Sequence, residues 1–302
     1  MEALSWKYRK RWNEYFSDFS RYGAIFYTIY ISFIFLNTFC TSQLVVNVKN
    51  KGGDLIQESI QADTKDNLIT LEFQKLDGTL LKMLIDFKSE VQIFKVIVLG
   101  EEERGETQYQ TVCFVTRFAK NEFISSDAMS KLRQKNPGTI RNPEEDKGKE
   151  HITLDLGIHL EKSSRISPYI YNICSEAKSS IYSREQDVRA WSKGNKLLAL
   201  YPNLALSTKG SNMTYNTLIS ATQKLQGTIK TPRCNTSKDW WKPCQCRFEM
   251  CIGWYPCGLK YCRGRDSAGK VVSYRCGIKT CKKCRSFDYY VGQRSYCMWD
   301  EM

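Results

Sequence analysis

The sequence predicts an α+β fold, in which a small antiparallel β-sheet flanked by helices is followed by a small disulfide-rich β/loop domain. Three observations predict it. Runs of β-branched and aromatic residues dominate the first half of the chain, a few segments carry helix start and stop signals, and ten of the 13 cysteines lie between residues 234 and 297. A chain of 302 residues is long enough for about two domains.

The amino terminus decides the compartment. Residues 1–23 are rich in Lys and Arg, residues 24–40 are apolar and uncharged, and the small residues CTS follow at 40–42. This order predicts a secretory signal peptide within residues 1–42, cleaved near Ser42. The alternative is a type II membrane anchor through residues 24–40, although a spanning helix needs about 20 apolar residues. In either case the rest of the chain enters an oxidising lumen, and we expect a secreted, extracellular protein.

Residues 43–192 form the predicted body. Its strand-like runs are residues 44–50, 68–74, 76–87, 90–100 and 107–118. The third run begins with the pair Asp77-Gly78, which separates two alternating stretches and predicts a tight hairpin. We therefore expect an antiparallel meander of four or five strands.

Helical and linking segments follow. Residues 124–136 have a hydroxyl N-cap in Ser125 or Ser126 and a stop at Pro137, which predicts a helix. Residues 142–150 read as a charged, mobile linker, residues 151–161 as one half-buried strand, and residues 172–191 as one amphipathic helix.

The body contains two cysteines, Cys113 and Cys174, which we expect to pair with each other. Closing a loop of about 60 residues would stabilise the fold by roughly 4 kcal/mol. The alternative is two buried free thiols.

Several segments resemble a known family. They are residues 58–101, CFVT, SDAMSKLRQKNP and DVRAW in the body, and WYPCGLKYC, YRCGIKTC, SFDYYV and CMWDE towards the end. Together they resemble the Out at first family over nearly everything after the signal. The resemblance implies a secreted protein with a developmental setting and a BRICHOS-like body, whose pattern of one aspartate and two cysteines is matched by Asp86, Cys113 and Cys174. We expect a structural role for Asp86; the alternative is a pH-sensitive aspartate that regulates opening of the sheet.

Residues 193–232 are rich in Ser, Thr, Asn, Gly and Lys and predict a flexible linker. Two N-x-S/T sequons, at Asn212 and Asn235, predict glycosylation.

The predicted tail, residues 233–302, is too short for a comfortable apolar core, so disulfides are expected to support it. Its ten cysteines are Cys234, Cys244, Cys246, Cys251, Cys257, Cys262, Cys276, Cys281, Cys284 and Cys297. A zinc site is the alternative, but there is a single CxxC and both histidines are distant in sequence, so we expect no metal. Spacing leaves the pairing open. In the family pattern Cys251 and Cys284 exceed what many members carry, which implies that these two pair with each other.

The tail is also basic, with 14 Lys or Arg against 6 Asp or Glu. Two clusters stand beside aromatic residues: Arg263, Arg265, Lys279, Lys282, Lys283 and Arg285. For a secreted protein these predict binding to heparan-type glycans rather than to nucleic acid. The alternative is a solvated basic face.

The sequence contains no GxSxG, HExxH, P-loop or Rossmann fingerprint. We therefore expect no enzymatic activity, no catalytic residue and no cofactor. The predicted function is a secreted protein that binds an extracellular protein, receptor or glycan through its cystine-rich basic tail. The alternative is an extracellular BRICHOS-type chaperone that shields aggregation-prone β-segments.

Overall fold

The structure is a computed structural model that describes residues 43–49, 52–100, 109–193, 211–225, 231–265, 267 and 269–297. The predicted signal peptide and anchor therefore lie outside the described residues. One compact unit runs from Ser42 to Met302. It is mostly β-sheet with few helices, and its carboxyl-terminal region is rich in disulfides.

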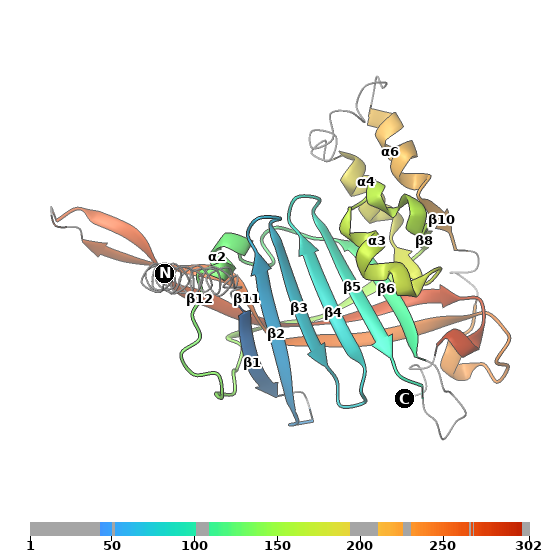
Figure 1. Cartoon of the computed structure of the whole chain (residues 1–302), viewed down its shortest axis with the longest axis horizontal. Coiled ribbons are helices and arrows are strands. Elements are labelled where there is room, and N and C mark those ends of the chain that lie inside the picture. The colour runs from blue at the N-terminus through green and yellow to red at the C-terminus, as the bar shows by residue number, and fades with distance from the viewer. Residues whose placement is uncertain are drawn as a thin grey trace, which may run out of the picture. The chain divides into compact units, whose positions relative to one another are not determined.

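The first sheet has nine strands in the order β1-β2-β3-β4-β5-β6-β9-β8-β10 (Figure 1). Their bounds are β1 Gln43–Lys49, β2 Leu55–Asp63, β3 Leu68–Gln74, β4 Leu80–Asp86, β5 Val91–Val98, β6 Gln110–Arg117, β8 Leu156–Ile158, β9 Ile181–Ser183 and β10 Thr222–Lys224. Neighbours are antiparallel except β6 and β9, which are parallel. The sheet is thus larger than the predicted meander. Strand β2 is not among the predicted runs, and β8, β9 and β10, of three residues each, are too short to show an alternating pattern.

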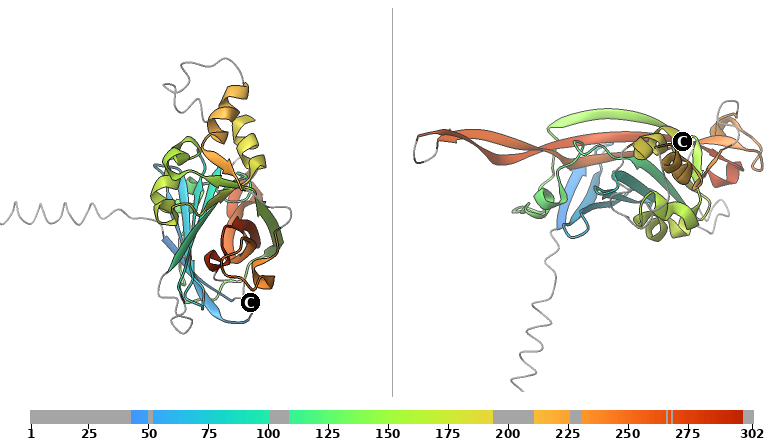
Figure 2. Two further views of the ribbon diagram at one scale, coloured as in Figure 1. Left: turned by 90° about the vertical axis from the view of Figure 1, so that its right-hand side faces the viewer. Right: turned by 90° about the horizontal axis from the view of Figure 1, so that it is seen from above.

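The second sheet contains β11 (Cys244–Arg265), β12 (Val271–Val291) and β7 (Glu145–Leu154). Strands β11 and β12 form a long antiparallel hairpin, and β7 runs parallel to β12 on its other side. This sheet crosses behind the strands of the first one as a second layer (Figures 1 and 2).

A single apolar core fills the space between the two sheets. Phe94 and Phe114 enter it from the first sheet, and Phe248 and Phe287 enter it from the hairpin. The rings of Phe114 and Phe287 stack with centroids 4.4 Å apart. Residues 43–192 and 233–297 therefore share one core.

A second core lies on the opposite face of the first sheet. Ile93 and Val115, which alternate with the inward-facing residues of β5 and β6, pack there with Ile170 and Val188. The helices of this layer are α3 (Tyr169–Cys174), α4 (Glu185–Lys193) and α6 (Ser211–Ile219). Because β5 and β6 are buried on both faces, apolar residues occupy consecutive positions in both strands, as in VCFV at 112–115, and neither strand alternates strictly.

The predicted helix over residues 172–191 is interrupted. Helix α3 ends at Cys174, a short 3₁₀ helix η3 spans Ser175–Ala177, and Lys178 takes a positive φ of 51° that reverses the chain. Strand β9 and helix α4 follow. The sheet overrides the helical pattern here because Ile181 is fully buried and pairs with Cys113.

The predicted linker 142–150 and strand 151–161 are also different in the structure. Residues 145–150 belong to β7, and the alternating segment divides at Asp155, where β7 ends before β8 begins in the other sheet. Leu154 enters the core between the sheets and Leu156 enters the helical core. The apolar residues of one alternating segment thus pack into two different cores. The alternation itself does not show where the segment passes from one sheet to the other.

Two further segments differ from expectation. The helix predicted at 124–136 is reduced to α2 (Ser126–Ser130), whose N-cap Ser125 accepts a hydrogen bond from the Ala128 amide. The predicted linker 193–232 contains α6 and β10, while its residues 194–210 and 226–230 lie outside the described residues. The remaining 3₁₀ helices are η2 Leu160–Arg165, η5 Cys234–Thr236 and η6 Arg294–Tyr296.

Candidate functional site

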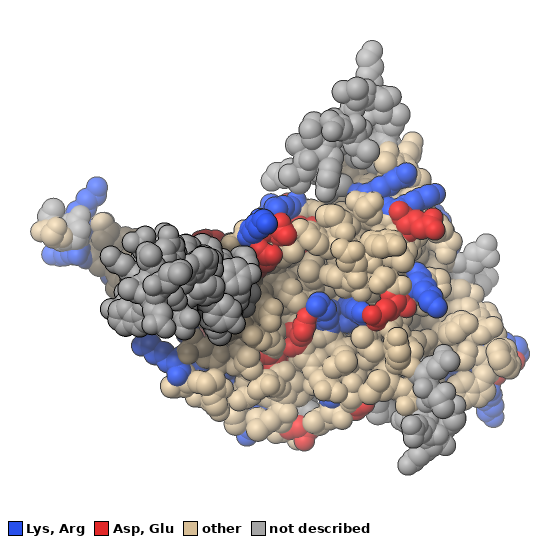
Figure 3. Space-filling view, viewed as in Figure 1, with Lys and Arg blue, Asp and Glu red and all other residues tan. Residues whose placement is uncertain are grey.

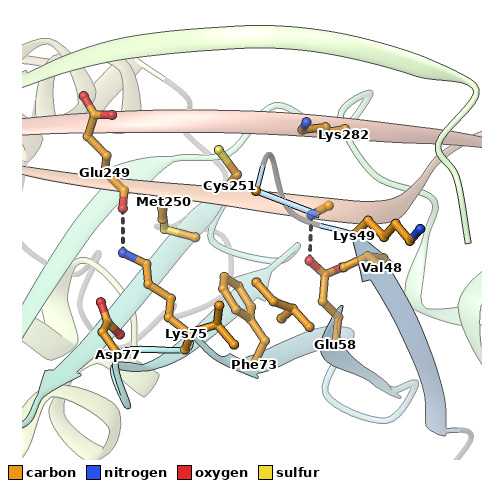
Figure 4. Close-up of a pocket in the computed structure, with 14 residues that line it drawn as sticks. Val48, Lys49, Glu58, Phe73, Lys75, Asp77, Glu249, Met250, Cys251 and Lys282 are labelled. Atoms are coloured by element: carbon orange, nitrogen blue, oxygen red, sulfur yellow. Dashed lines mark hydrogen bonds between the residues drawn. The ribbon is translucent and has the colours of Figure 1, made fainter. Parts of the chain in front are cut away.

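A pocket of about 390 Å³ opens where β1, β2 and β3 meet the hairpin strand β11 (Figure 4). Its lining comes from both layers: Val48, Lys49, Gly52, Ile56, Glu58, Phe73, Lys75, Leu76, Asp77, Glu249, Met250, Cys251, Gly253 and Lys282. In Figure 4, Lys75 and Glu58 extend from the first sheet towards β11 on opposite sides of the pocket. This is one of the places where the predicted body and tail are joined by polar contacts.

Glu58 makes the most informative of these contacts. Register shifts in the β11–β12 ladder between Ile252 and Tyr255, so Gly253 and Trp254 together face a single residue of β12 as a β-bulge. The Glu58 carboxylate accepts the amide hydrogens of Gly253 at 2.6 Å and Trp254 at 3.0 Å. A side chain of β2 thereby satisfies backbone donors that the bulge withdraws from the ladder.

Glu58 is 1% exposed. Its burial raises the pKa of the carboxyl to about 7, although the two amide donors act in the opposite direction. Sequence patterns alone do not single out this residue. An acidic residue in an inward-facing position of β2, between the apolar positions Ile56 and Ile60, is visible only once the register is known.

Gly253 fits this junction because it lacks a side chain. A Cβ atom placed there would lie 2.8 Å from Cγ2 of Val48 and 3.3 Å from a carboxylate oxygen of Glu58. Strand β11 can therefore approach β1 and β2 closely enough for the carboxylate to reach the bulge.

Lys75 lies across the pocket from Glu58. Its ammonium donates to the backbone carbonyl of Glu249 at 3.0 Å and lies 4.6 Å from the ring centroid of Phe248. Burial lowers the pKa of Lys75, although the charges of Asp77 and Glu249 favour its protonated form. A single lysine thus contacts the hairpin through one hydrogen bond and one cation–π contact.

The basic residues predicted to bind glycans do not form one continuous surface. Arg285 is 5% exposed, lies over the Phe94 ring and pairs with Glu122 and Glu150. Lys283 pairs with the same two glutamates. These two side chains serve the contact between β12 and the body, so Arg285 is unsuited to bind a glycan.

Two more of the predicted residues also have acidic partners. Lys279 forms an ion pair with Glu145 at 2.5 Å, and Lys282 lies 4.0 Å from Asp146. Arg263 and Arg265 are exposed, and neither forms an ion pair with any acidic residue in the described part of the chain.

Arg263 and Arg265 lie on an arm of the hairpin, which we define as residues 260–265 and 271–277. Strand β7 pairs with β12 only from Cys281 onward, so in the described residues the arm strands pair only with each other. The arm extends beyond the first sheet (Figures 1 and 2). Figure 3 shows basic groups at its tip, whereas basic and acidic groups lie side by side over the sheet.

The ladder register gives the arm two different faces, because opposed residues point to the same side. One face carries the pairs Tyr261 with Arg275, Arg263 with Ser273, and Arg265 with Val271. The other carries Cys262 with Tyr274 and Gly264 with Val272. An isolated two-stranded ribbon is marginal in water, and the Cys262–Cys276 disulfide cross-links this one.

All twelve cysteines of the described chain form disulfides. The body contains the pair expected from the sequence, Cys113–Cys174. The others are Cys234–Cys244, Cys246–Cys297, Cys251–Cys284, Cys257–Cys281 and Cys262–Cys276. The sulfurs of Cys234, Cys246 and Cys297 cluster within 4.8 Å, but each is held in a disulfide and is not a free thiolate ligand.

Asp86 is fully buried at the end of β4. One carboxylate oxygen accepts the amide hydrogens of Lys88 and Ser89, and the other accepts the hydroxyl of Ser167, 2.9 Å away. The side chain thus closes the β4–β5 turn and ties it to the segment that begins α3, which is a structural role.

The two sequons lie in different surroundings. Asn235 is exposed within η5, beside the Cys234–Cys244 disulfide. Asn212 lies within α6. No helix in the described residues is long and apolar enough to cross a membrane.

Comparison with known proteins covers most of the chain. The family described as "Out at first" matches residues 42–191, and "Out at first, C-terminal" matches residues 233–301. The chain is 49% identical to an Out at first protein of Drosophila melanogaster over 88% of its length, but spans about half (53%) of that relative. It is 49% identical to an Out at first protein of Drosophila virilis over 86% of this chain and 83% of the relative. No solved structure matches.

Glu58 should make stability depend on pH. Its pKa is raised from 4.5 to about 7 in the folded chain, so the folded state holds a proton that the unfolded state releases. The contribution is fully present below pH 4.5 and is lost as pH rises through about 7, by roughly 3 kcal/mol at most. In chemical denaturation with the disulfides intact, Glu58→Gln should therefore gain stability relative to the wild type across this window. Parallel pH profiles for the two proteins would contradict the assignment.

Gly253→Ala should destabilise the chain, because the new methyl group would overlap Val48. We expect a loss of about 1–3 kcal/mol in the free energy of unfolding. Gly258→Ala is the matched control in the same strand, since its Cβ would lie an ordinary 3.6 Å from Lys279. Equal effects of the two substitutions would show that the close approach at Gly253 is unimportant.

Proposed function

Because the chain belongs to the Out at first family, we propose that it is a secreted, non-enzymatic protein that acts outside the cell by binding a partner through its cystine-rich basic hairpin, in a developmental setting. Six disulfides support the compartment, because such bonds persist in oxidising environments. The exposed sequon at Asn235 fits the same compartment.

One observation carries the choice of surface. Of the six basic residues selected from the sequence, four face acidic residues of the body, and only Arg263 and Arg265 are exposed without an ion pair in the described chain. They lie two residues apart in one strand and therefore on the same face of the arm. A pair of aligned guanidinium groups beside Tyr261 is suited to an anionic partner.

A heparan-type glycan is the proposed class of partner. Its sulfate and carboxylate groups are fixed charges on an extended chain, and cationic side chains bind such polyanions mainly by releasing counterions. Binding of this kind weakens steeply with salt and requires no enclosed site. The arm provides such a surface because it is exposed on both faces over residues 271–276.

The alternative function is a BRICHOS-type chaperone with a BRICHOS-like body. The inner apolar face of the first sheet would have to shield a client, and this face is covered by Phe248 and Phe287 of the hairpin. The free edge of β1 is also occupied, because the Gln134 side chain bonds the amide and carbonyl of Val45. Chaperone activity would therefore require the hairpin to move, and suppression of amyloid growth by the full chain would favour this alternative.

Heparin affinity tests the proposed surface. Replacing Arg263→Gln and Arg265→Gln together should shift elution of the full chain to lower salt and reduce the slope of log affinity against log salt by roughly 2, one for each lost charge. The matched control is Lys279→Gln with Lys282→Gln, which removes the same net charge from paired positions.

The control should lower the elution salt by much less than the arginine variant does. Equal losses in both variants would mean that net charge, not the arm, determines retention. Elution of the wild type near physiological salt would count against a glycan partner altogether.

A further inference from the structure

The pocket beside Glu58 has a different chemistry from the arm. It lies between two layers, and its walls are apolar side chains from both: Val48, Ile56 and Phe73 from the first sheet and Met250 from the hairpin. Its volume of about 390 Å³ falls within the range of small-molecule sites. No residue of the arm lines it, so an occupant would act independently of the proposed glycan surface.

We propose that this pocket binds a small amphiphile that has an aliphatic chain and a terminal carboxylate. The chain would lie along the apolar walls, and the carboxylate would lie against the ammonium of Lys75. The proposal does not rest on the proposed function, because it uses other residues and another class of ligand.

The charges favour an anionic head group. Three lysines line the pocket, Lys49, Lys75 and Lys282. Lys49 is exposed and forms no ion pair in the described chain. The ammonium of Lys282 lies as far as 4.0 Å from the nearest carboxylate oxygen of Asp146, so this ion pair is long. Each lysine therefore retains hydrogen-bond donors for a ligand.

The three carboxylates of the pocket are already engaged. Glu58 accepts the two bulge amides. Asp77 accepts the amide hydrogen of Thr79 at 2.8 Å, and Glu249 pairs with Lys149. Glu58 is buried on the bulge amides and Glu249 is paired with Lys149, so Asp77 is the one exposed carboxylate of the pocket that forms no ion pair in the described chain, against three lining lysines.

Lys75 is the residue on which selectivity should depend. Its ammonium has three donors, and its contacts in the described chain are one backbone carbonyl and the face of Phe248. A partly buried ammonium with donors to spare gains from a carboxylate, because a charge-assisted hydrogen bond is stronger than a neutral one. Figure 4 shows this side chain reaching across the pocket beside Met250 and Phe73.

Titration calorimetry of the full chain with its disulfides intact tests the proposal. The probes are decanoate, decanol and decyltrimethylammonium, which share a chain and differ in the charge of the head group. We expect saturable binding of decanoate at one site per chain, with affinity about tenfold higher than that of decanol, the size of one charge-assisted hydrogen bond. Decyltrimethylammonium should not bind at this site.

Variants assign the binding to the pocket. Lys75→Met keeps the length of the side chain and should lower the affinity for decanoate about tenfold while leaving decanol unchanged. Lys82→Met is the matched control, because Lys82 pairs with Glu72 away from the pocket lining. Ile56→Trp should abolish binding of both probes by filling the space, and circular dichroism should show that this variant is folded.

Three results would overturn the proposal. They are the absence of saturable binding of decanoate, equal affinity for the cationic probe, or equal effects of Lys75→Met and Lys82→Met. Loss of heparin retention in the arginine variants would be unaffected by any of them, so failure of this proposal and failure of the glycan surface can be told apart.

Discussion

The packing of the hairpin on the inner face of the first sheet is the contact on which the rest of the structure depends. The disulfides do not make it. Cys113–Cys174 lies within the body, and the other five bridges lie within residues 234–297. What joins the two parts is non-covalent: the stack of Phe114 on Phe287, the ladder between β12 and β7, and the Glu58 carboxylate on the bulge.

The hairpin contacts the body along only part of its length, and this determines which of its basic residues are paired and which are exposed. Near the sheet, basic residues of the hairpin form ion pairs with acidic residues of the body. Lys283 and Arg285, for example, pair with Glu122 and Glu150. Beyond the sheet, none of the described arm residues belongs to either apolar core, and a disulfide cross-links the ribbon at Cys262–Cys276. The arginines on that segment therefore remain available to a partner. The pocket at the junction is a separate feature, formed beside the close approach of the two layers at Gly253.

Sequence reasoning was most successful where one physical signal dominated. Cysteine number gave the body disulfide, the Asp77-Gly78 turn gave the β3–β4 hairpin, and runs of β-branched and aromatic residues gave β3 to β6. It was least successful where tertiary contacts decide. The short strand β9 lies within a segment whose sequence predicts a helix. Residues 145–150 pair in parallel with β12, and their local sequence does not predict a strand. Glu58 and the pairing of Arg285 depend on strand register, which a single sequence does not provide.

Native-state hydrogen exchange measures the central contact most directly. If the hairpin and the first sheet share one core, the slowest amides of β11 and β12, near Phe248 and Phe287, should exchange with the same free energy of opening as those of β5 and β6, near Phe94 and Phe114. The account predicts one cooperative unit with a single denaturant dependence. Opening of residues 234–297 at a clearly lower free energy, while β5 and β6 stay protected, would contradict it and would show that the tail is a separate domain.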